Sequence, residues 1–280
     1  MPSLLIFGLG YAASHIAATA RDAGWEVNAT GSAGNIAFDD TGSVRVALAQ
    51  ATHILSSVPP LVDGDPVLRS YGDAIRASPA RWVGYLSSTG VYGDTGGAWV
   101  DESAPILGRR ESRNDADRDW QALSPTVRVF RLPGIYGPGR SAIERVGEGK
   151  AHRIALPGQV FSRIHVSDIA SAVMASTRAP PGVYNLADDH PCSQNAVIEA
   201  AAHLLGVAPP PLQTLEDAQL SPQALAFYAE NRRVSNVKAK RLLGWRPAYP
   251  DFTAGLRAIM AMTSPAIASS PPAIENTVQR

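Results

Sequence analysis

Cysteine is almost absent from this chain of 280 residues, since Cys192 is the only one. A single thiol can form neither an intrachain disulfide framework nor a cysteine-based zinc site, and we expect no metal site. No apolar run is long enough to cross a bilayer, and the first residues lack the basic stretch and cleavage pattern of a secretory signal. A cytoplasmic protein without a membrane partner is therefore expected.

A surplus of charge of one sign is also missing, because 25 basic residues balance 25 acidic ones. No overall field draws such a chain to a phosphate backbone, so nucleic acid is not expected as a partner. The hydrophobic share of 45% and the charged share of 18% are ordinary for a globular protein. The length allows one large α/β domain, or a nucleotide-binding domain with a smaller lobe.

Short apolar runs alternate with helical patterns through the first half of the chain. Ser3–Phe7 is an apolar run that ends at glycines, and apolar residues then recur at helical spacing over 11–23. This pattern predicts a strand, a tight turn and a helix. Further strands are predicted over 25–29, 53–57, 82–87 and 127–131, and helices over 67–77 and 114–123. Strands alternating with helices predict an α/β fold with a Rossmann-type, doubly wound parallel sheet.

The pattern changes beyond Tyr136. Helices are predicted over 166–176, 193–205, 234–243 and 252–262, with one short strand over 183–186. We therefore expect a smaller C-terminal α/β substrate lobe over the carboxyl ends of the strands. The expected division is an NAD(P)-binding core in 1–140, a lobe with returning segments mainly in 141–262, and a disordered tail rich in Ser, Pro and Ala in 263–280.

The turn Gly8-Leu9-Gly10, between the first strand and the first helix, is the candidate cofactor site. Glycine lets backbone N–H groups approach a pyrophosphate, toward which a helix N-terminus presents roughly half a positive charge. Ala13 stands where a third glycine often does. Glycine pairs also occur in ordinary tight turns, but the position after the first strand of an alternating pattern favours dinucleotide binding.

The segment after the second strand bears on the choice of cofactor. Many NAD-binding folds place there an acidic residue that bonds the ribose 2′-hydroxyl, and residues 28–32 contain none. This absence slightly favours NADP over NAD, although no arginine stands there to pair with a 2′-phosphate. Asp39 is either an acceptor for the adenine amine or a solvated turn residue. The expected cofactor contacts are Gly8, Gly10, Tyr11, Ala13, Ser32, Asp39, Ser57, Pro59, Ser87 and Pro133.

Several motifs, taken in order, resemble the extended short-chain dehydrogenase/reductase superfamily, the NAD-dependent nucleotide-sugar epimerases and dehydratases. They are Leu86–Asp94, Val100–Glu102, Arg131–Gly139, Ile164–Ala170, Val183–Leu186 and Leu243–Trp245. The resemblance spans roughly residues 3–262. It implies bound NAD(P), a small-molecule substrate such as a nucleotide sugar in the C-terminal lobe, and Ser88 as the hydroxyl that bonds the reacting oxygen. It also implies a structural role for Tyr92, and for His165 and Asp168 a core or capping role where the lobe meets the sheet.

The catalytic Tyr–Lys pair of that superfamily is missing. There the two residues lie four apart on one helix and pass a proton during hydride transfer, whereas the three lysines here, Lys150, Lys238 and Lys240, do not follow a tyrosine at that spacing. Arginines occupy the corresponding helix, and arginine cannot cycle a proton near neutral pH. Arg113 is the candidate for holding the nicotinamide ribose, with Arg109 as a competitor, although both also fit a solvated helix face.

Two functions remain open at this point. The first is an atypical oxidoreductase or epimerase-like enzyme that acts on a nucleotide-sugar-like or small carbonyl or hydroxyl substrate, with Ser88, Arg113 and Tyr136 as candidate catalytic residues and Tyr136 or water moving the proton. The second is a catalytically silent NAD(P)-binding regulatory or scaffold protein, which the missing pair favours. Dehydration is disfavoured, because the superfamily's sugar dehydratases carry an acidic pair where this chain has Thr89-Gly90. The oligomeric state stays open, a dimer included.

Overall fold

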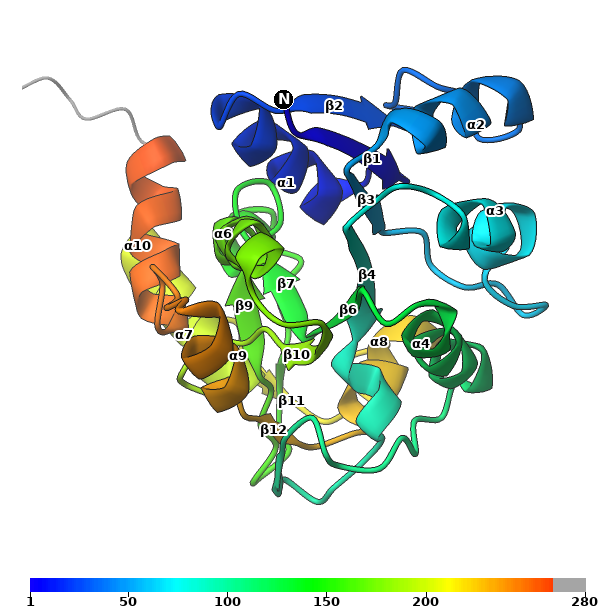
Figure 1. Cartoon of the computed structure of the whole chain (residues 1–280). Coiled ribbons are helices and arrows are strands. Elements are labelled where there is room, and N and C mark those ends of the chain that lie inside the picture. Colours follow the sequence, from blue (N-terminus) through cyan, green and yellow to red (C-terminus); the bar gives the residue numbers. More distant parts are fainter. Residues whose placement is uncertain (264–280) are drawn as a thin grey trace, which may run out of the picture.

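A six-stranded parallel sheet forms the centre of the molecule (Figure 1). The computed structural model describes residues 1–263, so the expected tail, apart from Thr263, lies outside the described residues. The predicted doubly wound parallel sheet is confirmed. Its strand order is β10-β6-β4-β3-β1-β2, with β1 at Ser3–Phe7, β2 at Glu26–Ala29, β3 at His53–Ser56, β4 at Trp82–Ser88, β6 at Val127–Leu132 and β10 at Gly182–Asn185.

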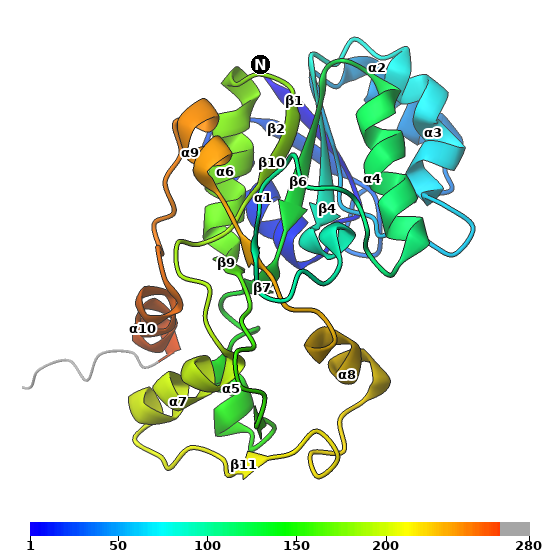
Figure 2. The ribbon, with the colours of Figure 1, turned by 90° about the horizontal axis from the view of Figure 1, so that it is seen from below.

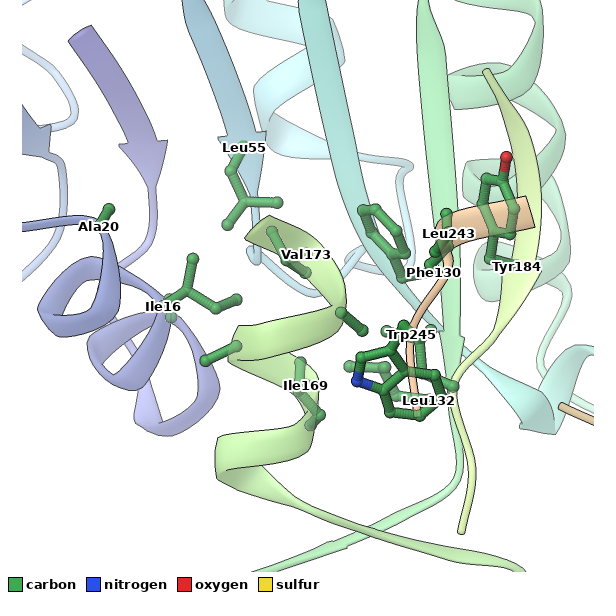
Figure 3. Packing of buried hydrophobic residues seen from close by; sticks show 14 of the residues in the cluster. Ile16, Ala20, Leu55, Phe130, Leu132, Ile169, Val173, Tyr184, Leu243 and Trp245 are labelled. Atoms are coloured by element: carbon green, nitrogen blue, oxygen red, sulfur yellow. The ribbon is translucent and has the colours of Figure 1, made fainter. Parts of the chain in front are cut away.

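Helices cover both faces of the sheet (Figure 2). On one face lie α1 (Tyr11–Asp22) and α6 (Val166–Ala175), and on the other lie α2 (Thr41–Gln50), α3 (Pro66–Arg76) and α4 (Glu111–Leu123). The buried stripe of α1 consists of Ile16 and three alanines, whose small side chains let the helix lie close to α6. Figure 3 shows Ile16 in one cluster with Ile169 and Val173 of α6.

The strand order changes direction at β1, which makes this strand the topological switch point of the sheet. β2 pairs with one edge of β1 and β3 with the other, so the connections that leave β1 and β3 pass to opposite faces of the sheet. In open α/β sheets, ligands bind at such a switch point, beyond the carboxyl ends of the strands. Here the switch point lies between the glycine turn after β1 and the segment after β3.

A smaller lobe, with its own apolar core, follows the sheet. That core contains Tyr136, Ile143, Ala201, Leu256 and Ile259. The lobe is built from β7 (Gly134–Tyr136), α5 (Ala142–Gly147), β8 (Arg153–Ile154), β9 (Arg163–His165), α7 (Gln194–Leu205), β11 (Leu212–Gln213), α8 (Pro222–Tyr228) and α10 (Phe252–Thr263). Although α6 and β10 come from the second half of the chain, they return to the main sheet.

One predicted helix begins later than expected. Arg233–Val234 forms strand β12, which pairs in parallel with β5 (Trp99–Val100), so α9 spans only Val237–Leu243. The sequence could not show this, because the pairing partner lies more than 130 residues away. None of the described helices is long and apolar enough to cross a membrane.

Candidate functional site

The turn after β1 is fixed by Gly8 and Thr30. Gly8 has φ +80°, a left-handed conformation that favours glycine, and a Cβ at this position would come within 2.8 Å of Val58 Cγ2. The Gly8 N–H donates to Thr30 Oγ1 (3.1 Å), and the Leu9 N–H donates to the Thr30 carbonyl (3.1 Å). These bonds tie the turn to the end of β2 and so fix the direction in which α1 starts.

Gly10 leaves the N-terminus of α1 open. Its φ of −81° suits any residue, and it gives the helix no side-chain cap. A Cβ built on Gly10 would meet no atom of the described residues within 4 Å. The first N–H groups of a helix have no partners within the helix, and they carry the positive end of its dipole. The absent Cβ therefore leaves free space at an anion-binding helix end, which fits the pyrophosphate of a dinucleotide.

The other residues expected near the cofactor are spread around this switch point. Ser57 and Pro59 follow β3, and the Ser57 hydroxyl donates to the Gly8 carbonyl (2.5 Å). Ser32 and Asp39 are exposed in the connection between β2 and α2. Tyr11, by contrast, uses its hydroxyl to donate to the Pro138 carbonyl (3.0 Å), which ties α1 to the loop after β7.

Ala13 and Ser87 are buried in the interior of the protein. Ala13 is buried in the core between α1 and the sheet, so its part is close helix packing. The Ser87 hydroxyl donates to Asp117 Oδ2 (2.6 Å) on the buried side of α4. The hydroxyl of Ser87, a residue expected near the cofactor, is therefore bonded in the interior of the protein, because successive residues of a strand point to opposite faces.

A buried ion pair joins β6 to α4 beside the end of β4. Arg131 donates to both carboxylate oxygens of Asp117 (2.7 and 3.1 Å), and both side chains are almost fully buried. Arg131 also donates to the Tyr92 hydroxyl (3.0 Å), which donates to Asn185 Oδ1 (2.7 Å). The structural role expected for Tyr92 is confirmed, because this network joins β4, β6, β10 and α4 around Ser87.

Ser88 ends β4 and borders a cavity. Its Oγ accepts a hydrogen bond from the Gly90 N–H (3.1 Å), which leaves the hydroxyl proton free to be donated to a ligand. The cavity has a volume of about 240 Å³, and we call it the arginine cavity. Ser88, Arg113 and Pro133, three residues predicted from the sequence, line it together. Its other charged residues are Arg109, Arg110, Arg232 and Glu230.

The arginine cavity has more positive than negative charge. Glu230 pairs with Arg109 (2.8 Å) and Arg232 (2.6 Å). Although burial raises the pKa of this carboxyl, the hydrogen bonds from both arginines lower it overall. The side chains of Arg110 and Arg113 have no hydrogen-bond or ion-pair partner within residues 1–263. Burial lowers the pKa of Arg113, yet guanidinium remains charged at neutral pH.

Tyr136 lies outside the arginine cavity. Its hydroxyl donates to the Asp251 carbonyl (3.4 Å) beside the start of α10. Burial and three nearby carboxylates raise the pKa of Tyr136 far above its usual value. The side chain lines a second cavity of about 500 Å³, among α5, α7, α8 and α10. Ser88 and Tyr136 therefore line two different cavities.

His165 and Asp168 connect the lobe to the main sheet. The His165 side chain caps α6, with Nδ1 accepting from the Ser167 N–H (3.3 Å). The Asp168 carboxylate accepts from the backbone N–H groups of Ala248 (2.6 Å) and Tyr249 (3.1 Å). The expected core or capping role is confirmed, because both side chains are buried and His165 caps α6.

Two features of the arginine cavity were not found from the sequence. Arg232 comes from the segment after α8, and no motif or spacing connects it with Ser88. An aromatic pair, Phe161 and Phe227, forms another wall, with parallel rings 4.1 Å apart. In the part of the chain that the structure describes, no three His, Cys, Asp or Glu residues are grouped to hold a metal ion.

Comparison with known proteins finds relatives that differ in sequence identity to this chain. No protein-family model matches the chain. A functionally unknown conserved protein from Silicibacter pomeroyi DSS has 41% sequence identity and a TM-score of 0.84, over 94% of this chain and 100% of that one. A 3-diazoavenalumate denitrifying reductase from Streptomyces sp is 28% identical over 210 residues, and the match covers 66% of this chain and 66%, just under two thirds, of the reductase.

Among solved structures with bound cofactor, the UDP-glucose 4-epimerase of Thermus thermophilus, in complex with NAD, has the same fold. Its TM-score is 0.74 at 21% identity, over 95% of this chain and 100% of the epimerase. At this identity the likeness shows the fold alone.

Proposed function

Because the chain belongs to the same family as the Silicibacter pomeroyi protein and has the fold of the extended short-chain dehydrogenase/reductase superfamily, we propose that it is an NAD(P)-dependent oxidoreductase with an atypical active site. One observation carries the proposal. The open N-terminus of α1 at Gly10 and the cavity beside Ser88 both lie at the carboxyl edge of the sheet, so a dinucleotide at the first can reach the second. The reductase from Streptomyces supports reduction as the direction.

Different residues of the chain would bind different parts of the cofactor. The N–H groups that begin α1, after Gly10, would hold the pyrophosphate, and Ser57 and Pro59 would lie on the other side of the switch point. Arg113, half-buried and without a protein partner among residues 1–263, would donate to the nicotinamide ribose hydroxyls. The β2–α2 connection, with Ser32 and no carboxylate at the strand end, accommodates NADP as well as NAD. When bound, the nicotinamide supplies a hydride.

Ser88 would polarise the reacting oxygen. Its free hydroxyl proton can be donated to the oxygen on which negative charge develops, and a preorganised donor of this kind lowers the barrier. Reduction of a carbonyl also needs one proton. Because no tyrosine among the described residues lines the arginine cavity, we assign the proton to water and not to Tyr136, whose hydroxyl lies at Asp251.

Replacing Ser88 by alanine tests the proposal. Once a screen of small carbonyl compounds and nucleotide sugars has found a substrate, single-turnover oxidation of NADPH should slow by about a hundredfold in Ser88→Ala. Affinity for the cofactor should stay unchanged. Ser103→Ala, at an exposed serine whose hydroxyl bonds Asp101, is the matched control and should keep full activity.

Two outcomes would contradict the proposal. Full activity in Ser88→Ala would show that the hydroxyl has no part in the reaction. If the wild-type chain binds NADPH and turns over none of the compounds, the chain is an NAD(P)-binding protein without this activity.

A further inference from the structure

The charge of the arginine cavity indicates the class of ligand that it takes. Four arginines and one glutamate line it. Guanidinium groups withdrawn from water are costly unless acceptors surround them, and Arg113 is half-buried without such an acceptor among residues 1–263. Ribose hydroxyls would satisfy hydrogen bonds of Arg113 but bring no negative charge. The surplus of positive charge therefore remains for a second ligand.

Part of this positive charge, the guanidinium of Arg232, lies next to the hydroxyl of Ser88. A Cβ built on Gly90 would be 3.2 Å from Ser88 Oγ and 4.0 Å from Arg232 Nη2, so the hydroxyl and the guanidinium flank the same glycine. Arg232 uses Nη1 to bond Glu230 and the Gly93 carbonyl, which leaves its Nη2 without a partner in the part of the chain that the structure describes. A small molecule with an anionic group at Arg232 would thus place its neighbouring atoms at Ser88.

The volume of the arginine cavity and its aromatic wall limit the size and the chemistry of the rest of the ligand. The volume of about 240 Å³ lies below the 300–1,000 Å³ usual for pockets that hold drug-sized ligands. The Phe227 ring stacks on Phe161, and the residue as a whole is still 44% exposed. Phe227 lines the arginine cavity, and an aromatic side chain in a cavity wall favours a planar, apolar partner.

We propose that the substrate is a small planar carboxylic acid, with its carboxylate bound by Arg110 and Arg232 and its apolar body against Phe227. This inference rests on the proposed function, since it assigns the substrate class of the same site. Guanidinium groups bind carboxylates through paired hydrogen bonds, which an uncharged analogue of the same shape cannot reproduce.

Binding of benzoate, compared with its neutral analogue benzamide, tests the proposal by calorimetry on the full chain, with and without NADP⁺. We expect benzoate to bind and benzamide to bind at least tenfold more weakly. Arg110→Gln and Phe227→Leu should each weaken benzoate several-fold. Arg110 has no partner within residues 1–263 that its loss would disturb. Arg118→Gln, on the helix that starts directly after Arg110 but paired with Asp115 and outside the cavity, is the control and should bind benzoate as the wild type does.

Three results would overturn the proposal: no benzoate binding at millimolar concentration, equal binding of benzamide, or unchanged benzoate affinity in Arg110→Gln. Failure of the proposed function would look different, because NADP⁺ would then not bind, or NADPH would not be oxidised, whatever the affinity for benzoate.

Discussion

Asp117→Ala should destabilise the protein strongly, because it removes the only carboxylate bonded to a buried guanidinium within the described chain. Asp117 accepts two hydrogen bonds from Arg131, one from Ser87 and one from Gln121, and the Arg131 side chain is only 3% exposed. Alanine would leave Arg131 buried without a counter-charge. Breaking such a pair typically costs about 3–5 kcal/mol, a large part of the roughly 5–15 kcal/mol that stabilises a whole domain.

Urea and thermal unfolding measure the effect. With about 2–4 °C of melting temperature per kcal/mol in a domain of this size class, we expect Tm to fall by roughly 6–20 °C. Asp115→Ala is the matched control, since Asp115 pairs with Arg118 on the solvent side of the same helix and both are more than half exposed. Its free energy of unfolding should change by about 0.5 kcal/mol or less.

A double variant separates charge burial from packing. Replacing both partners, as Asp117→Leu with Arg131→Met, removes the unpaired charge and should recover much of the stability that Asp117→Ala loses. If Asp117→Ala unfolds at the same urea concentration as Asp115→Ala, the ion pair between Asp117 and Arg131 does not stabilise the protein and the reasoning is refuted.

Gly10→Val should leave the fold intact, since a Cβ at Gly10 would meet no described atom, but its side chain should block the pyrophosphate. At 100 times the cofactor Kd, the cofactor should stabilise the wild type by about 2.7 kcal/mol and the variant not at all. Equal thermal shifts in both proteins would contradict this. Burial raises the pKa of Asp188 to about 8, so the folded state holds a proton that the unfolded chain has released, and wild-type stability should fall as pH rises from about 4 to about 8. Between pH 6.5 and 8, the free energy of unfolding of Asp188→Asn should rise relative to that of the wild type. This window avoids the buried His53 and His165, whose pKa is lowered to about 4 and which therefore change charge on unfolding only below pH 6.5. Parallel stability curves for the two proteins would show that Asp188 is not the group responsible.

Local patterns predicted the elements of the sheet to within a few residues. The alternation of short apolar runs with helical spacing indicated β1, α1, β3 and β4, because an element that buries one face must repeat its apolar residues with its own period. The glycine turn was found in the same way, since its place between the first strand and the first helix is local. Elements without such a pattern were missed, among them α2, α5 and α8.

The candidate site was predicted at two strand ends and at one position of a helix, Arg113 of α4. Ser88 and Pro133 lie at the ends of neighbouring strands β4 and β6, which the parallel sheet brings together. Tyr136 follows β6 by a few residues as well, but it belongs to β7, which pairs with β9, and its ring packs into the lobe. Its hydroxyl therefore points away from Ser88.

The sequence alone determined the parallel sheet, the open glycine turn and the absence of a Tyr–Lys pair, because each depends on residue type and on spacing within a few dozen residues. Only the tertiary structure decided what surrounds Ser88. Arg232 reaches the cavity through β12, whose partner β5 lies more than 130 residues earlier, and Ser87 is turned inward by Asp117 of α4. The direction of a side chain depends on which distant elements pack around it, and no local period encodes that choice.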